Sequence, residues 1–433
     1  MKLSRYTILR NYGDKTLFFN SMSCAFAIVD DSFKKVVSDI ENGIYDESKY
    51  DAKLIEQMKR TNAIINDDFD EIEYIKYARN LSKYDMTSLG LTIAPTLDCN
   101  FRCVYCFENH IHGAMSEDVQ NAIVDFIKAR TQRLKHLSIC WFGGEPLLSK
   151  AIIKHLSEEI MAICIEHGIN YSASIISNAY LIDDNVIADF KQFKIKDIQV
   201  TLDGTEKIHD ARRKTVSGKS SFWQIINNMK LLLENSISVS LRINIDNTNV
   251  SFVDDLLKLL ANETIFKERL VITFGKVSAV SEACKSVEKE CLTTEQYANS
   301  LIELYKKVLG YGFKKNLMIL YPRPHFNYCT YEYANSYVID PRGAIYKCWN
   351  HIGQKGKSCG SILGKTMIPS NFFMKCVNRD LIAGECSNCH FLPVCVGGCP
   401  DEAARQTEGH SCESIKYNFD NMLDFYYEQL KGK

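Results

Sequence analysis

The chain has 433 residues, 46% of them apolar, and its 52 basic residues almost balance its 53 acidic residues. These values are typical of a globular protein and exclude a disordered chain, a collagen and a coiled coil. The balanced charge gives no positive surface that would favour nucleic acid, and no apolar run approaches the roughly 20 residues that span a bilayer. The first residues lack the pattern of a signal peptide. We therefore expect a cytoplasmic protein that binds neither nucleic acid nor membrane.

Residues 1–85 have the pattern of a small separate module. Two strand-like runs, Tyr6–Arg10 and Thr16–Asn20, flank a turn-forming segment and predict a β-hairpin. Three helices and a short strand are expected after it, at Ser32–Glu41, Lys49–Thr61, Asp70–Lys83 and Ala63–Ile65. This arrangement resembles a winged-helix fold, and a structural cap on the main domain is the alternative.

Between residues 86 and 314 apolar strands alternate with helices. Six strand candidates follow one another, at Leu91–Thr96, Leu137–Phe142, Tyr171–Ile176, Ile198–Leu202, Ile237–Ile243 and Leu270–Phe274. Successive βα units predict a parallel sheet, and right-handed crossovers curl it toward a partial (β/α)6 barrel, so the fold class is α/β. The chemistry of such sheets lies at the carboxyl ends of the strands.

Ten of the 17 cysteines fall into two groups, which indicates metal or cluster binding because the chain lacks an export signal. The first group, Cys99, Cys103 and Cys106, follows the first expected barrel strand. Three thiolates can hold three irons of a [4Fe–4S] cube and leave the fourth iron open. A zinc site completed by His110 or His112 is the alternative.

The second group belongs to a Cys-rich C-terminal segment, residues 315–433, in which a hairpin is expected at Val338–Tyr346 and a helix at Ser414–Leu430. Its members are Cys329, Cys348, Cys386, Cys389, Cys395, Cys399 and Cys412. We expect a cluster-binding domain here, and a pair of zinc ribbons is the alternative.

The first group resembles the cluster motif of the radical S-adenosylmethionine superfamily, C-x3-C-x2-C with an aromatic residue, Tyr105, before the third cysteine. The resemblance extends over about residues 90–280. It adds Gly143-Gly144-Glu145-Pro146, which is similar to the family's GGEP motif, then Ser177-Asn178, and finally Arg213 with Arg242.

These matches imply roles in binding S-adenosylmethionine. Gly143, Gly144 and Glu145 would receive its ammonium group, since glycines allow close backbone approach and a carboxylate suits a cation. Ser177 and Asn178 would contact its ribose. Arg213, and similarly Arg242, would meet its carboxylate.

The second group resembles the SPASM extension of peptide-modifying radical enzymes, which implies two auxiliary [4Fe–4S] clusters and three clusters in all. In the family's interleaved pattern, one auxiliary cluster would be held by Cys386, Cys389, Cys395 and Cys412, and the other by Cys329, Cys348 and Cys399. Some relatives have a further cysteine where this chain has Asn335. The second auxiliary cluster would therefore keep an open iron, or take a ligand such as Cys359 or Cys376.

The resemblance implies that an electron from a donor such as ferredoxin or flavodoxin cleaves S-adenosylmethionine, and that a 5′-deoxyadenosyl radical then abstracts a substrate hydrogen. In the sulfatase maturases of this family an Asp base follows the Cys of a G-x4-C element. Here that residue is Trp349, which counts against formylglycine formation.

The module at residues 1–85 resembles the element that captures the leader of a precursor peptide by strand addition. We therefore expect an enzyme that matures a ribosomal precursor peptide. The favoured modification is a Cys thioether crosslink, followed by a carbon–carbon crosslink or an epimerisation. Formylglycine formation and a non-catalytic zinc-binding protein are the alternatives. The sequence assigns no catalytic residue.

Overall fold

The computed structural model describes residues 1–431 except 355, 365–369, 382–383 and 407–409. The chain forms two compact units, and each is assembled from separate stretches of sequence. Unit 1 comprises Met1–Tyr84, Leu320–Tyr333 and Asn378–Lys433, and unit 2 comprises Asp85–Ile319 and Ala334–Val377. No helix in the described part of the chain is long and apolar enough to cross a membrane.

Unit 2 is built on a parallel sheet, and the six predicted strands are confirmed. They are β6 (Ser88–Ile93), β10 (His136–Trp141), β11 (Asn170–Ile176), β12 (Ile195–Thr201), β14 (Ser238–Ile245) and β15 (Val271–Lys276), and they lie in this order across the sheet. The first strand begins and ends earlier than its apolar run suggested, so the residues after Ile93 already belong to the loop that carries the first cysteines.

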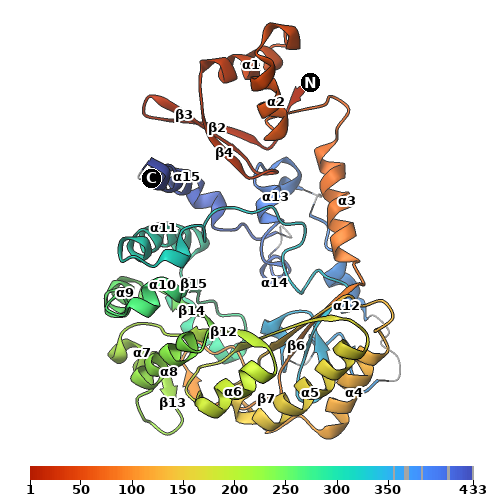
Figure 1. Ribbon diagram of the computed structural model, residues 1–433, viewed down its shortest axis with the longest axis vertical. Coiled ribbons are helices and arrows are strands. Elements are labelled where there is room, and N and C mark those ends of the chain that lie inside the picture. The colour runs from red at the N-terminus through yellow and green to blue at the C-terminus, as the bar shows by residue number, and fades with distance from the viewer. Residues whose placement is uncertain (355, 365–369, 382–383, 407–409, 432–433) are drawn as a thin grey trace. The chain divides into compact units, whose positions relative to one another are not determined.

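Helices cover the outer side of these strands (Figure 1). They are α4 (Glu117–Lys128), α5 (Lys150–Glu166), α6 (Asp184–Gln192), α7 (Glu206–Arg212), α8 (Phe222–Glu234), α9 (Val253–Ala261), α10 (Thr264–Arg269) and α11 (Thr294–Gly310). Along β14 every second side chain is buried, from Val239 to Ile245, while Arg242 and Asn244 face the other way. The face opposite the helices is thus partly polar at the carboxyl ends of the strands.

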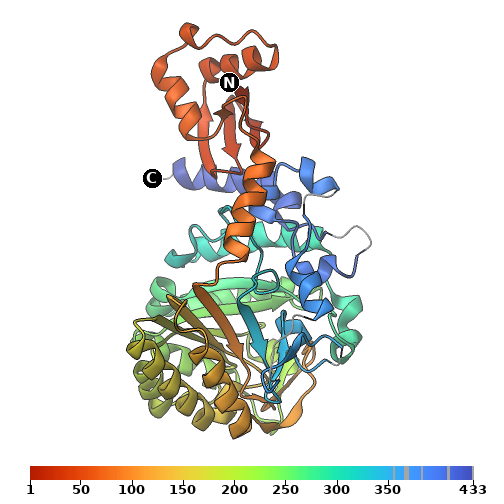
Figure 2. The same ribbon diagram turned by 90° about the vertical axis from the view of Figure 1, so that its right-hand side faces the viewer.

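A feature that the sequence did not reveal extends this sheet. The predicted hairpin is confirmed as β16 (Ser336–Ile339) and β17 (Ala344–Tyr346), with Val338 opposite Tyr346. However, β16 also pairs in parallel with β6, and the two strands lie side by side (Figure 2). The short strand β18 (Gly360–Ser361) completes a sheet of nine strands in the described residues.

In unit 1 the predicted hairpin is confirmed as β2 (Thr7–Tyr12) and β3 (Lys15–Asn20), and a third strand, β4 (Ala25–Val29), follows it. The helices α1 (Asp31–Glu41), α2 (Ala52–Arg60) and α3 (Glu71–Lys83) agree with expectation, and β1 (Lys2–Leu3) pairs with β5 (Ile64–Ile65). Asp30, Asp51 and Asp70 cap the three helices by accepting backbone N–H groups. The core of this region is apolar and includes Phe18, Phe33, Val36, Ile55 and Met58.

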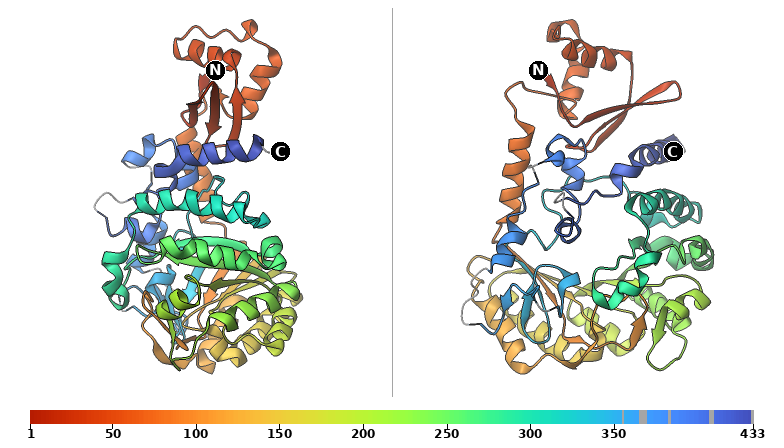
Figure 3. Two further views of the ribbon diagram at one scale, coloured as in Figure 1. Left: turned by 90° about the vertical axis from the view of Figure 1, so that its left-hand side faces the viewer. Right: turned by 180° about the vertical axis from the view of Figure 1, so that it is seen from behind.

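The predicted C-terminal helix, α15 (Ile415–Lys431), packs against the three-stranded sheet (Figure 3). The Phe19 and Phe419 rings are 5.2 Å apart, the Tyr12 and Tyr427 rings are 5.1 Å apart, and Arg10 forms an ion pair with Asp424. The N-terminal strands and the last Cys-rich stretch therefore share one packed unit.

Candidate functional site

The first cysteine group lies in a loop that two short ribbons hold in place. Strand β7 (Thr96–Leu97) pairs with β9 (Ile111–Ala114), and β8 (Phe101–Cys103) pairs with β13 (Arg213–Thr215). Within the second ribbon Cys103 is directly opposite Arg213. All three cysteines are partly exposed, and the Phe101 N–H donates to the Cys99 Sγ at 3.3 Å.

Gly143 and Gly144 follow β10 and lie against this loop. A Cβ at Gly143 would be 2.3 Å from the Thr96 carbonyl oxygen, and one at Gly144 would be 2.2 Å from that of Asp98. The Glu145 N–H donates to the same Asp98 oxygen at 2.8 Å. Both glycines are therefore needed because any side chain would push the cysteine loop away.

The Glu145 carboxylate is fully buried and joins the ends of two strands. It accepts hydrogen bonds from the Leu147 N–H at 3.0 Å, the Ser177 hydroxyl at 2.8 Å and the Asn178 N–H at 2.8 Å. Burial raises the pKa of Glu145, and these donors oppose the rise. The Asn178 side chain in turn donates to Asn100 in the cysteine loop at 2.7 Å. The structure thus brings Glu145, Ser177 and Asn178 together beside the cysteines, and their roles toward S-adenosylmethionine stay predictions.

A buried polar network surrounds the Tyr105 hydroxyl. This hydroxyl donates to Asp203 and accepts hydrogen bonds from Arg213 at 2.9 Å and from Asn244 at 3.2 Å. The Arg212 guanidinium lies 5.3 Å from the centre of the Tyr105 ring and forms an ion pair with Asp246 at 2.8 Å. Sequence reasoning singled out Tyr105 and Arg213 but missed Asn244 and Asp246, which no local spacing connects to the cysteines.

The two arginines that were expected near a carboxylate differ in their surroundings. The Nε of Arg213 is buried and has no hydrogen-bond partner among the described residues, so it has a donor to offer. Arg242 donates to Asn244 at 2.7 Å and covers Gly275, where a Cβ would lie 2.2 Å from its guanidinium. Of the two, Arg213 is therefore the arginine with a buried, unpaired donor.

The donor set of the loop fits an iron–sulfur cluster better than a single zinc ion. Ligand sulfurs on one zinc lie about 3.8 Å apart, yet Cys99, Cys103 and Cys106 do not form a described group whose Sγ atoms all lie within 4.8 Å. His112 is exposed and pairs with Asp98 instead, although the His110 Nε2 is 3.9 Å from the Cys106 Sγ. Burial raises the pKa of all three thiols, that of Cys106 to about 12, so their thiolates need a cationic partner.

One residue in this loop has no sequence signal at all. The Glu108 side chain is 7% exposed, its Oε2 has no hydrogen-bond partner in the described structure, and burial raises its pKa to about 8. A buried carboxyl without a partner is unusual outside functional sites.

Trp349, at the start of the turn η6 (Trp349–His351), has its ring 5.3 Å from Phe142, the residue before Gly143. It is 37% exposed. The position expected to carry an acid–base group in sulfatase maturases is therefore occupied by an indole beside the glycine pair.

The second cysteine site is a pocket in unit 1 with a cavity volume of about 70 Å³. Cys386, Cys389, Cys395 and Cys412 all line it. Burial raises the pKa of Cys395 to about 12, and Lys416 donates to the Cys412 Sγ at 3.3 Å. The four cysteines that the family pattern assigns to one auxiliary cluster are therefore together, and they fit such a cluster.

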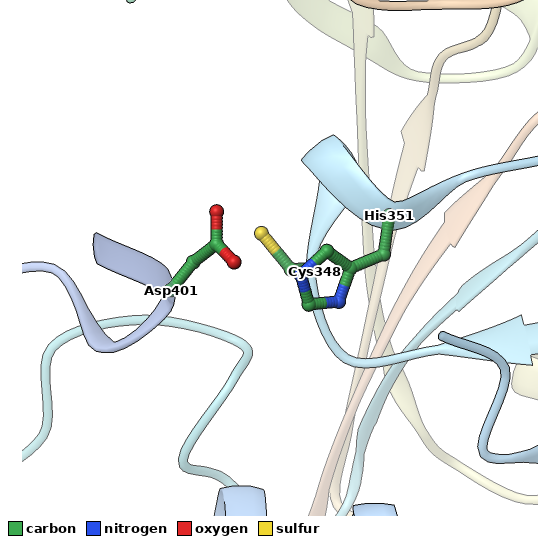
Figure 4. A group of neighbouring side chains, drawn as sticks. All are labelled: Cys348, His351 and Asp401. Atoms are coloured by element: carbon green, nitrogen blue, oxygen red, sulfur yellow. The ribbon is translucent and has the colours of Figure 1, made fainter. Parts of the chain in front are cut away.

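The other predicted auxiliary set is distributed over both units. Cys329 and Cys399 belong to unit 1, while Cys348 belongs to unit 2, where its Sγ lies within 4.8 Å of a His351 ring nitrogen (Figure 4). This ligand set stays a prediction. Asn335, at the position where some relatives have a cysteine, is buried and donates to the Ser88 carbonyl oxygen at 2.8 Å.

Comparisons with known proteins bear on the family and the fold of this chain. The chain matches the Radical SAM superfamily over residues 93–260. It is 24% identical over 366 residues to a cysteine-type anaerobic sulfatase-maturating enzyme of Clostridium novyi, which covers 78% of this chain and 96% of that protein. It is 22% identical to the radical SAM cyclopropyl synthase TigE of Paramaledivibacter caminithermalis, over 70% of this chain and 65% of that one.

Solved structures share the fold. The structure of anSMEcpe with bound AdoMet and Cp18Cys peptide superimposes with a TM-score of 0.61 at 19% identity, over 79% of this chain and 98% of that chain. Streptococcus suis SuiB bound to S-adenosylmethionine gives a TM-score of 0.55 at 17% identity, over 95% of this chain and 99% of that chain. Residues 93–260 therefore form a domain of the Radical SAM superfamily, and this enzyme is similar in sequence to the anaerobic sulfatase-maturating enzymes and similar in fold to Streptococcus suis SuiB.

Proposed function

We propose that this enzyme matures a ribosomal precursor peptide and installs a crosslink in it, a Cys thioether in the first instance. It would hold S-adenosylmethionine and three [4Fe–4S] clusters. The observation that carries this proposal is that one chain contains a three-thiol loop at the end of a barrel strand and a separate pocket lined by four cysteines. Three thiols leave an iron open to a small molecule, whereas four thiols close a cluster.

The barrel residues would bind and orient the cofactors. Cys99, Cys103 and Cys106 would hold a cluster that, together with S-adenosylmethionine, supplies hydrogen-atom abstraction from unreactive carbon. Glu145 and Arg213 are the charged groups at hand for the amino and carboxylate ends of the methionyl part. The apolar cluster beside them, which contains Leu97, Phe142, Val338, Tyr346 and Ile352, would exclude water from a reactive intermediate.

Trp349 supports a crosslinking activity over formylglycine formation. An indole cannot take a proton from a substrate at neutral pH, so the base of the sulfatase maturases has no counterpart at this position. A half-exposed aromatic ring offers an apolar contact to a peptide instead.

The N-terminal sheet supports recognition of a leader peptide. Among the described residues β4 pairs only with β3, so its other edge is free for an added strand. Helix α1 lies next to β4, and the Ile28 side chain on β4 is 52% exposed. The leader of the precursor peptide would therefore bind at this free edge of β4.

A thioether is favoured because the set Cys329, Cys348 and Cys399 has only three thiols, while Asn335 is engaged with the barrel strand β6. An open iron there would suit the thiolate of a substrate cysteine.

The test uses the full chain, prepared without oxygen, with a Cys-bearing precursor peptide encoded beside its gene. A thioether removes two hydrogen atoms from the peptide and blocks alkylation of its thiol, and a Cys→Ser precursor should stay unmodified. Conversion of that cysteine to an aldehyde would establish formylglycine formation. Stoichiometric zinc with negligible iron would instead show a zinc protein.

Leader recognition is best tested by substitution rather than by deleting residues 1–85, since Arg79 and Phe19 of that segment pack on the rest of unit 1. Ile28→Asp should weaken leader binding by about tenfold, because it places a desolvated charge at the docking edge. Ile44→Asp is the matched control, since Ile44 is 63% exposed and lies outside the sheet. Equal affinity in both variants would exclude this edge.

A further inference from the structure

An arginine outside the cysteine motifs holds the loop between two cysteine ligands. Residues Val396, Gly397 and Gly398, between Cys395 and Cys399, all have positive φ angles of 45°, 71° and 65°. Arg379 spans this loop, with its Nη1 donating to the Gly398 carbonyl oxygen at 3.0 Å and its Nη2 to that of Gly397 at 2.5 Å. Gly397 itself lines the four-cysteine pocket.

The same arginine is tied to the loop that carries Cys329. Glu332 is fully buried and lies 3.7 Å from Arg379 and 3.2 Å from Arg79 of α3. Its other carboxylate oxygen accepts the Tyr328 N–H at 2.7 Å, and the Glu332 N–H donates to the Cys329 carbonyl oxygen at 3.0 Å. One buried carboxylate thus connects two arginines and a cysteine loop, all within unit 1.

The guanidinium still has a donor to spare. The Arg379 Nε is buried and has no hydrogen-bond partner in the described part of the chain. Burial lowers the pKa of Arg379, whereas Glu332 raises it and the thiolates of Cys386 and Cys399 act in the same direction as Glu332. The contacts of Arg379 agree with this, because Gly398 directly precedes Cys399 and Gly397 lines the same pocket as Cys386, and these two cysteines belong to different predicted auxiliary clusters.

We propose that Arg379 is a positioning residue for the auxiliary iron–sulfur site in the four-cysteine pocket. Arg379 fixes the Cys395–Cys399 loop, and its buried charge and free Nε–H stabilise the reduced cluster. The inference rests on the proposed function in one respect, that the four-cysteine pocket holds a cluster. A positive charge and a hydrogen-bond donor both favour the more negative, reduced state, so they raise the midpoint potential. Glu332 acts in the opposite direction.

The experiment uses the Cys99→Ala, Cys103→Ala, Cys106→Ala variant, in which only auxiliary clusters remain, and an EPR-monitored redox titration. Arg379→Gln should lower the ratio of reduced to oxidised cluster at a fixed potential by about tenfold, equivalent to 59 mV for one electron. Arg379→Lys keeps the charge and should give a smaller change. Glu332→Gln should shift the ratio in the opposite direction.

Arg405→Gln is the matched control, because Arg405 also pairs with a carboxylate near the cysteines but is 41% exposed, and it should leave the potential unchanged. If Arg379→Gln cannot retain iron, the sign of the Glu332→Gln shift decides, and the absence of a rise overturns the inference. Clusters present with equal potentials in all variants would overturn the inference alone. No auxiliary iron in the starting variant would overturn the proposed pocket as well.

Discussion

The two cysteine sites differ in what surrounds their thiols. The first loop lies among hydrogen-bonding side chains from several strand ends, namely Glu145, Ser177, Asn178, Asp203 and Asn244. The second site is a pocket lined by short helical turns, loops and the start of α15, where Lys416 donates to the Cys412 Sγ.

This difference matches the two tasks that we propose for the sites. Polar groups beyond the ligands are required where a small polar cofactor must be bound and oriented against a metal. A cluster that only stores or passes electrons needs four ligands and a controlled charge around it. The barrel site has the first kind of surroundings and the pocket has the second.

The strongest test of this comparison removes the first site alone. The variant with Cys99, Cys103 and Cys106 changed to Ala should release no 5′-deoxyadenosine, because it lacks the barrel cluster whose open iron would chelate S-adenosylmethionine beside Glu145 and Arg213. Its iron content should fall by about a third, from about twelve irons to about eight. Residual cofactor cleavage would show that the barrel loop is not the site.

Glycine substitutions should disturb one site at a time. Gly144→Ala should deplete the barrel cluster, because the new Cβ would lie 2.2 Å from the Asp98 carbonyl oxygen. Gly398→Ala should deplete the auxiliary cluster, because the new Cβ would lie 1.5 Å from the Ser411 carbonyl oxygen. Each variant should lose about four irons and give a different EPR spectrum. Gly310→Ala is the control, because nothing lies within 4 Å of its Cβ. Full iron loading of both variants would contradict the steric argument.

Glu145→Gln tests whether the polar surroundings serve the cofactor. If the carboxylate receives the cofactor ammonium, the variant should bind S-adenosylmethionine about ten- to a hundredfold more weakly, the 1.5–3 kcal/mol of a charged hydrogen bond. Isothermal titration calorimetry measures the change, and Glu166→Gln, at the exposed end of α5, is the control. Unchanged affinity with a lowered melting temperature would leave Glu145 only its role in joining strand ends.

The smallest effect concerns acid sensitivity of the barrel. His209 on α7 is fully buried, lies 3.1 Å from the Ser221 hydroxyl, and burial lowers its pKa to about 3. The folded state therefore favours neutral histidine, and stability should decrease as the pH falls below 6.5, by about 2 kcal/mol at pH 5. His209→Gln should reduce this pH dependence in thermal unfolding. An equally steep dependence in the variant would assign the acid sensitivity to other groups.

Local patterns in the sequence were sufficient for the barrel strands, the capped helices and the cysteine loops. The strands are apolar runs, and the helices begin at capping residues such as Asp30 and Asp70, so both are visible within a short window. Strand β4 was missed because its side chains are partly exposed and do not alternate.

The parts of the site that sequence could not predict depend on distant contacts. Asn244 meets Tyr105 across 139 positions, and Arg79 meets Glu332 across 253. No periodicity or spacing records such pairs, because they follow from how strands and loops are brought together. The same holds for Arg379, whose partners are backbone carbonyls that any sequence supplies.

The parallel pairing of β16 with β6 has a consequence for synthesis of the chain. About 240 residues separate the two strands, so at 5–20 residues per second β16 leaves the ribosome roughly 12–50 s after β6. Throughout this interval β6 presents an unpaired edge, to which strands of other nascent chains can add. Slower elongation lengthens the interval, and expression at low temperature therefore has two opposed effects on the yield of this enzyme, since it also slows aggregation.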